Sequence, residues 1–164
     1  MRTIRIIAAV LSLVGGVAFA DPGREALPFH GAVGDERPAD FTLQGLDGQP
    51  VTLSQFLGKK PVLLVFWATW CPECKAAFPK INALHGGPAG EKMQILALDY
   101  RETREKVAAA VKSRDIRFPV LLDDRGQVAR SFGVVGIPTY VLIGRDGTVV
   151  YRENVLPADI SRYL

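Results

Sequence analysis

The chain has 164 residues, of which 48% are hydrophobic and 23% are charged, and its formal net charge is +3. A chain of this length suits one domain and can bury a sizeable core. Lysine and arginine are scattered along the sequence, without the basic cluster that marks a nucleic-acid-binding surface, so we expect no nucleic-acid partner.

Residues 1–20 have the three parts of a secretory signal peptide. Arg2 and Arg5 form a short basic start, and the apolar residues 6–20 end in Ala18-Phe19-Ala20. This ending resembles an A-x-A cleavage site. We therefore predict cleavage after Ala20 and a periplasmic protein. A permanent N-terminal membrane anchor is the alternative, although the run is short compared with the ~20 apolar residues of a spanning helix.

The segment after the predicted cleavage site mixes proline, glycine and charge. Residues 21–38 show no periodicity, so we predict an extended leader there. One domain then covers residues 39–164, with neither an internal repeat nor a second domain. It opens with two short strands, at 39–43 and 50–53, and Asp47-Gly48 between them is a strong hairpin signal.

The middle of the chain alternates between strand and helix patterns, which predicts a partly parallel sheet. The continuous apolar run at 62–67 is typical of a strand that is buried on both faces. Asp123-Asp124 could suggest metal or acid–base chemistry, but we interpret it as a loop start and a helix N-cap. The elements expected between residues 55 and 132 are a helical turn (55–57), strands (62–67, 93–98, 118–122), helices (72–84, 101–114, 127–132) and a loop (86–90).

The last part of the chain predicts two more strands and a short helix. Residues 140–143 and 149–151 should pair across the hairpin turn Arg145-Asp146-Gly147. Residues 157–164 can form a brief terminal helix. The hairpin adds an antiparallel edge to the parallel portion, so the expected fold class is α/β, a mixed central sheet flanked by helices.

The two cysteines, Cys71 and Cys74, lie between the strand at 62–67 and the helix that follows it. Such a loop lies at the carboxyl edge of the sheet, where α/β proteins place their sites. Cys71 would lie at a helix N-terminus, where peptide dipoles and free N–H groups favour the nucleophilic thiolate. Cys74 falls one turn later, close enough to bond to Cys71. We predict a reversible disulfide in which Cys71 attacks and Cys74 resolves.

Two other interpretations of the cysteine pair remain open. A structural disulfide is possible in an exported protein, but it would close a very small loop and constrain the unfolded chain little. Half of a zinc site would need two further ligands. Only His30 and His85 are available, and they form no His pair. We predict no metal and no cofactor.

Residues 66–74 (FWATWCPEC), followed by Phe78-Pro79 and later by Gly136-Ile137-Pro138-Thr139, resemble the thioredoxin superfamily. The export signal, the leading hairpin and residues 118–123 resemble its exported TlpA/ResA-like branch. The resemblance covers about residues 34–151. It implies a thioredoxin fold with an extra N-terminal β-hairpin and the activity of a protein-disulfide reductase.

The resemblance also implies roles for residues around the cysteines. The Ile137–Pro138 bond would be cis and lie against the disulfide, and the Ile137 backbone could pair with an extended substrate. Trp70 and Pro138 would shape a flat apolar docking surface. Pro72 and Glu73, between the cysteines, would tune the redox pair.

The sequence departs from the family at two positions. Thioredoxins have a buried Asp where this chain has Val65, and ResA-like reductants have a Glu where it has Ala77. The proton of Cys74 must therefore leave another way, through water or Glu73. Glu73 would also disfavour a thiolate and raise the pKa of Cys71, which favours a reductant. The alternative is a solvated glutamate without redox effect.

We expect a monomeric exported thiol-disulfide oxidoreductase that reduces protein disulfides and is recharged by a membrane dithiol donor. The resemblance implies substrates such as apocytochrome c before haem attachment, or the thiols of a copper site. A thiol peroxidase is one alternative, but Ala68 occupies the position of its usual Thr, and Thr69 is out of register. A copper-binding assembly chaperone is another; it would want wider cysteine spacing and a partner such as His85.

Overall fold

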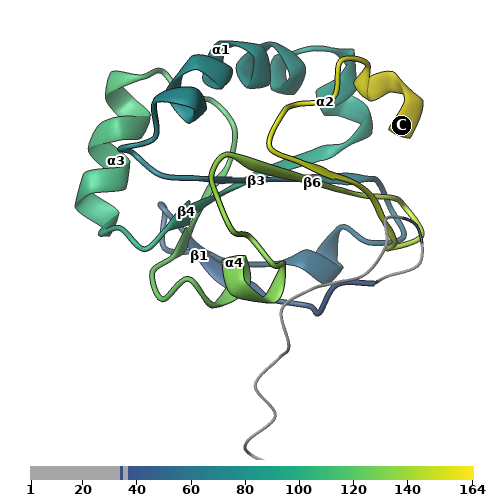
Figure 1. Cartoon of the computed structure of the whole chain (residues 1–164), viewed down its shortest axis with the longest axis horizontal. Helices are drawn as coiled ribbons and strands as arrows, with labels where there is room; N and C mark the ends of the chain where they lie inside the picture. The colour runs from purple at the N-terminus through teal and green to yellow at the C-terminus, as the bar shows by residue number, and fades with distance from the viewer. Residues whose placement is uncertain (1–33, 35–36) are drawn as a thin grey trace, which may run out of the picture.

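The computed structural model describes residue 34 and residues 37–164 (Figure 1). The predicted signal peptide, residues 1–20, lies outside the described residues, as does most of the predicted leader at 21–38. Gly34 is the first described point of the leader, and its N–H donates to the Val149 carbonyl at 2.7 Å. Among the described residues, no helix has the length and apolar character needed to cross a bilayer.

One seven-stranded mixed sheet forms the centre of the fold, in the order β2-β1-β5-β4-β3-β6-β7. β3, β4 and β5 run parallel, whereas β6 is antiparallel to both β3 and β7. β1 pairs antiparallel with β2 as a hairpin and antiparallel with β5 on its other side. The strands are β1 (Thr42–Gly45), β2 (Pro50–Thr52), β3 (Val62–Trp67), β4 (Gln94–Tyr100), β5 (Val120–Asp123), β6 (Thr139–Ile143) and β7 (Val149–Glu153).

Helices cover both faces of this sheet. α1 and α3 lie on one face, and α4 lies on the other (Figure 1). This arrangement confirms the α/β fold class with a mixed sheet flanked by helices. The helical segments are η1 (Leu53–Gln55), α1 (Pro72–Gly86), α2 (Pro88–Lys92), α3 (Arg104–Ser113), α4 (Gln127–Ser131) and η2 (Ile160–Tyr163).

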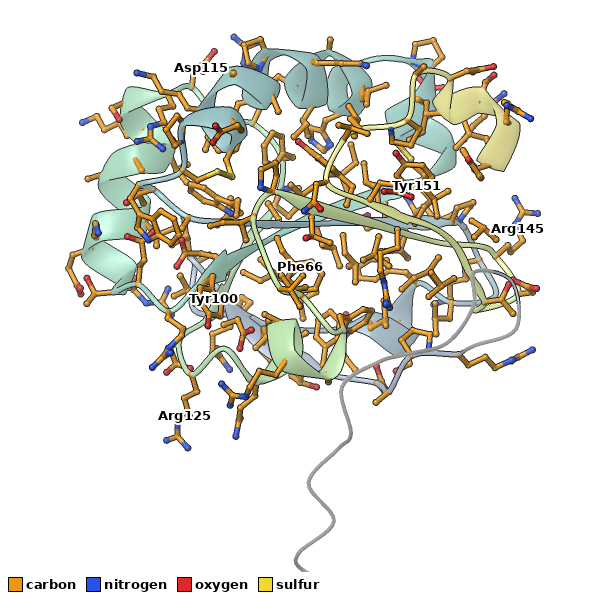
Figure 2. The ribbon with its side chains drawn as sticks, viewed as in Figure 1. Phe66, Tyr100, Asp115, Arg125, Arg145 and Tyr151 are labelled. Carbon is orange, nitrogen blue, oxygen red and sulfur yellow. A yellow bond between two sulfur atoms is a disulfide. The ribbon has the colours of Figure 1, made fainter. Side chains whose placement is uncertain are left out.

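β3 is buried along its whole length, as its apolar run predicts. Leu63 and Trp67 point into the core beneath α1, with the two cysteines, while Phe66 points to the opposite core. Figure 2 shows Phe66 on the side of the sheet that faces α4, where its ring lies 5.6 Å from that of Phe132. A strand with two packed faces is rigid, so it fixes the position of the loop that follows it.

Two helical predictions need correction. The sequence predicts a loop at 86–90, but α2 begins within this segment, at Pro88. Proline is favoured at the first helical position, where its missing N–H has no partner in any case, and Ala89 packs on the core. The brief terminal helix is a 3₁₀ segment, η2, capped by the Asp159 side chain.

The segment between β4 and α3 also differs from its prediction. α3 begins at Arg104, after the N-cap Thr103, and not at residue 101. Arg101 has φ of 62°, a left-handed conformation that is uncommon for a residue with a side chain. The chain therefore turns sharply after β4 and directs Glu102 back toward the sheet edge.

Asp123 has a structural role, as the sequence indicates for the acidic pair, but it is the last residue of β5, and the N-cap residue of α4 is Gly126. Its carboxylate is buried and accepts the backbone N–H groups of Val128, at 3.3 Å, and Ala129, at 2.8 Å. These are N–H groups near the start of α4, which has no side-chain cap from its own N-cap residue, Gly126. Asp123 thus ties α4 to the end of β5.

Asp123→Ala is expected to lower the free energy of unfolding by about 1–3 kcal/mol, because it leaves two buried N–H groups without acceptors. Thermal unfolding should detect this as a drop in Tm of several degrees, about 2–4 °C per kcal/mol. Asp124→Ala is the matched control, since Asp124 is exposed. Equal losses in the two variants would contradict this role.

Candidate active site

Cys71 and Cys74 form a disulfide, with an S–S distance of 2.07 Å. Cys71 is the N-cap residue of α1, and Pro72 is its first residue. The Cys74 N–H donates to Cys71 Sγ at 3.1 Å. Both cysteines are 1% exposed. A thiolate at Cys71 would meet the same N–H and the positive end of the α1 dipole, and both would stabilise it.

The predicted companions of the disulfide gather at the same edge of the sheet. The Ile137–Pro138 peptide bond is cis, as predicted. Thr139 pairs with Phe66 in the β3–β6 register, which places Pro138 beside the end of β3, where the chain runs on to Cys71. Pro72 and Glu73 are exposed on the first turn of α1.

An apolar pocket of about 320 Å³ opens beside Trp70, the residue before Cys71. Trp70 precedes Cys71 and is 61% exposed, and Val135 on the facing loop is fully exposed. Exposed apolar groups of this kind are typical of a contact surface for another molecule. The pocket is lined by Trp70, Tyr100, Val134, Val135, Gly136 and Ile137.

The structure reveals a buried acid that the sequence analysis missed. Asp99 in β4 is fully buried and is the register partner of Trp67 in β3. Register partners in a sheet point to the same face, so Asp99 lies on the α1 side with the cysteines. Its Oδ1 accepts the Glu102 N–H at 3.2 Å. Neither Asp99 Oδ2 nor the Trp67 indole N–H has a hydrogen-bond partner among the described residues.

Glu102 connects this acid to the loop in front of Cys71. Its carboxylate accepts two hydrogen bonds from Thr69, from the backbone N–H and, at 2.8 Å, from the hydroxyl. Lys106 of α3 forms an ion pair with the same carboxylate. Arg114, just after α3, donates to the Thr69 carbonyl at 2.6 Å. Thr69 is therefore held at its N–H, hydroxyl and carbonyl.

The two carboxyl groups have opposite pKa shifts. Burial, and then the Glu102 carboxylate beside it, raise the pKa of Asp99 to about 8. Burial opposes the ionisation of Glu102 as well, but hydrogen bonds from Lys106 and Thr69 outweigh it and lower the Glu102 pKa. Near neutral pH the pair therefore holds one proton, on Asp99, and one negative charge, on Glu102.

One sequence signal could have pointed to Asp99. The predicted strand ended at residue 98, whereas β4 continues to Tyr100. Asp99 is thus a carboxylate at the carboxyl end of a buried parallel strand, the edge where α/β proteins place their sites. No local pattern indicates its connection to Thr69, because that contact spans 33 residues of sequence.

His85 lies at the wrong end of α1 to share a ligand with the cysteines. It belongs to the last turn of the helix, and Cys74 belongs to the first. With a rise of 1.5 Å per residue, the two positions are about 16 Å apart along the axis. This distance removes His85 as the partner that a copper-binding chaperone would need.

The sequence matches one described family over most of its length. The AhpC/TSA family matches residues 33–152. The thiol-disulfide oxidoreductase ResA of Bacillus thuringiensis subsp. konkukian is 38% identical over 118 residues, 72% of this chain and 67% of the relative. The ResA protein of Geobacillus thermodenitrificans is 31% identical over 166 residues, 100% of this chain and 92% of the relative.

Solved structures of the same kind share the fold. The exposed lipoprotein thioredoxin of Streptococcus pneumoniae superposes with a TM-score of 0.65 and is 30% identical, over 73% of this chain and 91% of that chain. A secreted disulfide oxidoreductase of Mycobacterium tuberculosis, described as homologous to E. coli DsbE, gives a TM-score of 0.63 and 27% identity, over 74% and 88%. Sequence and fold thus point to the same group of proteins.

Proposed function

This chain belongs to the AhpC/TSA family and is a ResA-like thiol-disulfide oxidoreductase with the thioredoxin fold, and we propose that it acts as a reductant of disulfides in exported proteins. The observation that carries the proposal is the Cys71–Cys74 disulfide at the N-terminus of α1, beside the exposed Trp70. This arrangement supplies a stabilised attacking sulfur, a resolving sulfur within bonding distance and an apolar contact surface.

The reaction is a two-step thiol–disulfide exchange. The Cys71 thiolate attacks one sulfur of the substrate disulfide, whose S–S bond breaks, and the departing substrate sulfur takes a proton. Cys74 then loses its proton and attacks Cys71 Sγ, which releases the second substrate sulfur. Two electrons pass from the dithiol to the substrate, and the Cys71–Cys74 disulfide remains.

The surface around the disulfide suits an extended substrate segment. The apolar side chains of Trp70 and Ile137 line one pocket there, and Ile137 is half-buried at its margin. Trp70 would contact the substrate, Ile137 would pair with its backbone, and Pro72 and Glu73 would tune the sulfurs. Pro138 is buried, so it would support this surface from within.

The protein is exported and works with partners in that compartment. Residues 1–20 act as a signal peptide cleaved after Ala20, or as an N-terminal anchor, and residues 21–38 lead into the domain at 39–164. The secreted and surface-exposed proteins with the same fold support an exported location. The protein is a monomer, and a membrane dithiol donor reduces its disulfide again after each reaction. Its substrates are proteins of cytochrome c maturation or of copper-site assembly.

A redox equilibrium with glutathione tests the direction of electron flow. We expect a reduction potential below about −200 mV, the range of reducing members of this fold. A potential near that of DsbA, about −120 mV, would reject the reductant and leave an oxidant. The fraction of disulfide at equilibrium can be measured by alkylating the free thiols and weighing the protein by mass spectrometry.

Glu73→Gln tests whether the residue between the cysteines contributes. Glu73 is exposed in the first turn of α1, where its charge opposes a thiolate at Cys71. Removing the charge should stabilise the reduced form and raise the potential by about 10–20 mV, as expected for an exposed charge pair. Glu91→Gln, an exposed first-turn glutamate of α2, is the control. Identical potentials in the parent and Glu73→Gln would leave Glu73 without redox effect.

A further inference from the structure

We propose that Asp99 and Glu102 work as one proton-carrying carboxyl pair that positions the loop in front of Cys71 and couples thiolate formation at Cys71 to ionisation of Asp99. The inference rests on the proposed role of Cys71 as the attacking sulfur. It assigns a role to two positioning residues outside the motif that contains the cysteines.

Asp99 occupies a place in the protein that favours its protonated form. It lies on the sheet face that carries the disulfide, level with the end of β3, and it is fully buried. One of its carboxyl oxygens accepts the Glu102 N–H, and the other has no hydrogen-bond partner among the described residues. An ionised oxygen without a donor is costly in such a place, so the geometry favours a protonated Asp99.

Glu102 and Arg114 connect the carboxyl pair to the loop in front of Cys71. Glu102 binds both the N–H and the hydroxyl of Thr69, and Arg114 binds the Thr69 carbonyl. Thr69 is two residues before Cys71, a stretch of chain that spans at most about 7 Å. The Glu102 carboxylate therefore lies close enough to Cys71 for their charges to interact inside the protein. A change in this pair alters both the position of the loop and the potential at the sulfur.

The charged groups that face Asp99 belong to α3 and to the segment just before it. Glu102 and Lys106 act on it from the α3 side, and Arg114 donates to the Thr69 carbonyl. The β3 and β5 register partners of Asp99 are Trp67 and Leu122, neither of which titrates in the working range of pH. From α1, the groups that titrate on this face are the reduced cysteines, because Glu73 is exposed to solvent.

The consequence is a coupled titration. Burial and Glu102 raise the pKa of Asp99 to about 8, in the range where a cysteine thiol also ionises. Once Asp99 loses its proton, two carboxylates stand behind the loop and oppose a thiolate at Cys71. The two groups then release their protons as a pair, and neither follows a simple titration curve.

Alkylation of Cys71 measures this coupling directly. In a Cys74→Ser background, the rate of reaction with iodoacetamide from pH 5 to pH 10 reports the thiolate fraction of Cys71. We expect a broadened, two-step profile for this background and a single, lower titration when Asp99→Asn is added. Each pKa unit of coupling corresponds to about a tenfold difference in thiolate fraction. A two-step profile that survives Asp99→Asn, or a single titration in the background itself, would overturn the proposal.

Two further variants separate charge at the pair from charge elsewhere. Glu102→Gln should keep the second step but move it to lower pH, since Asp99 no longer opposes a neighbouring carboxylate. Glu105→Gln removes an exposed negative charge from the first turn of α3 and should leave the profile unchanged. An equal change in Glu105→Gln would assign the effect to general electrostatics and reject the pair.

If Asp99→Asn folds poorly, the coupling can still be measured in a protein that keeps Asp99. Carbon NMR of the Asp99 carboxyl should show a higher pKa when Cys71 is a free thiolate than after Cys71 is alkylated, because coupling between two sites is reciprocal. Equal values would refute the coupling. Neither the alkylation profile nor the NMR titration uses a protein substrate, so either can contradict the coupling while the reductant function holds. Conversely, the glutathione equilibrium can contradict the reductant function while the coupling holds.

Discussion

A Cys74→Ser variant is expected to accumulate its target as a mixed disulfide through Cys71, and a Cys71→Ser variant is expected to form none. In the first variant the attacking sulfur remains but no resolving sulfur can displace the substrate. In the second, Cys74 lies in the first turn of α1 and lacks the N-cap position of Cys71, where a backbone N–H and the helix dipole would stabilise a thiolate. Non-reducing gels and mass spectrometry of an exported fraction would identify the trapped proteins.

The same two variants should lose catalytic reduction of insulin. With dithiothreitol supplied, we expect each to fall to the rate of dithiothreitol alone, since exchange needs both sulfurs. Ser54→Ala, at an exposed position outside the site, is a control that should keep the parent rate. Full activity in Cys71→Ser, or trapping by Cys71→Ser with none by Cys74→Ser, would reverse the roles assigned to the sulfurs.

Asp99→Asn is expected to make the oxidised protein more stable at alkaline pH while changing its stability little near pH 4. The pKa of Asp99 is about 8 in the folded protein and 3.8 when unperturbed. Between these values the folded state holds a proton that the unfolded state has released, so stability falls as pH rises through this window. Asparagine has the same size, can accept the Glu102 N–H and does not titrate. The variant therefore avoids that loss.

The gain in unfolding free energy should grow from pH 4 to pH 8 and then level off. At about 1.4 kcal/mol per pKa unit, the shift of Asp99 from 3.8 to about 8 sets an upper limit of about 6 kcal/mol on this gain. Urea unfolding of the parent and variant at a series of pH values gives this difference directly. Glu105→Gln again serves as the control, with no pH-dependent gain. A difference that stays constant between pH 4 and pH 8 would show that Asp99 does not carry the proton.

Asp99 supplies a buried acid on the sheet face that carries the cysteines, which the sequence analysis did not expect. The resemblance to the thioredoxin superfamily implies buried acids at the positions of Val65 and Ala77, and their absence leaves water or Glu73 to receive the proton of Cys74. Val65 pairs with Ala97 in the β3–β4 register, and Asp99 is two residues further along β4 on the same face. A buried acid is thus present on the neighbouring strand, and Glu73 is exposed on the outside of α1.

Several elements could be predicted because their signals are local. β3 is a continuous apolar run, and the Asp146-Gly147 turn joins β6 to β7 as its composition indicates. The disulfide follows from the spacing of its two cysteines at a strand-to-helix junction. α2 was missed because its residues, rich in glycine and proline, favour a loop. Packing of Ala89 on the core outweighs that weak preference.

The amino-acid sequence alone determined the order of the strands along the chain, the helices α1, α3 and α4, the redox pair and a structural role for Asp123, because each depends on residues that are neighbours along the chain. Only the tertiary structure decided that β1 also pairs with β5, that Trp70 and Ile137 line one pocket, and that Asp99 and Glu102 stand behind the loop of Cys71. These contacts join segments that are distant in sequence. Burial by those segments changes the chemistry of Asp99, so its role depends on the folded surroundings and not on the residue itself.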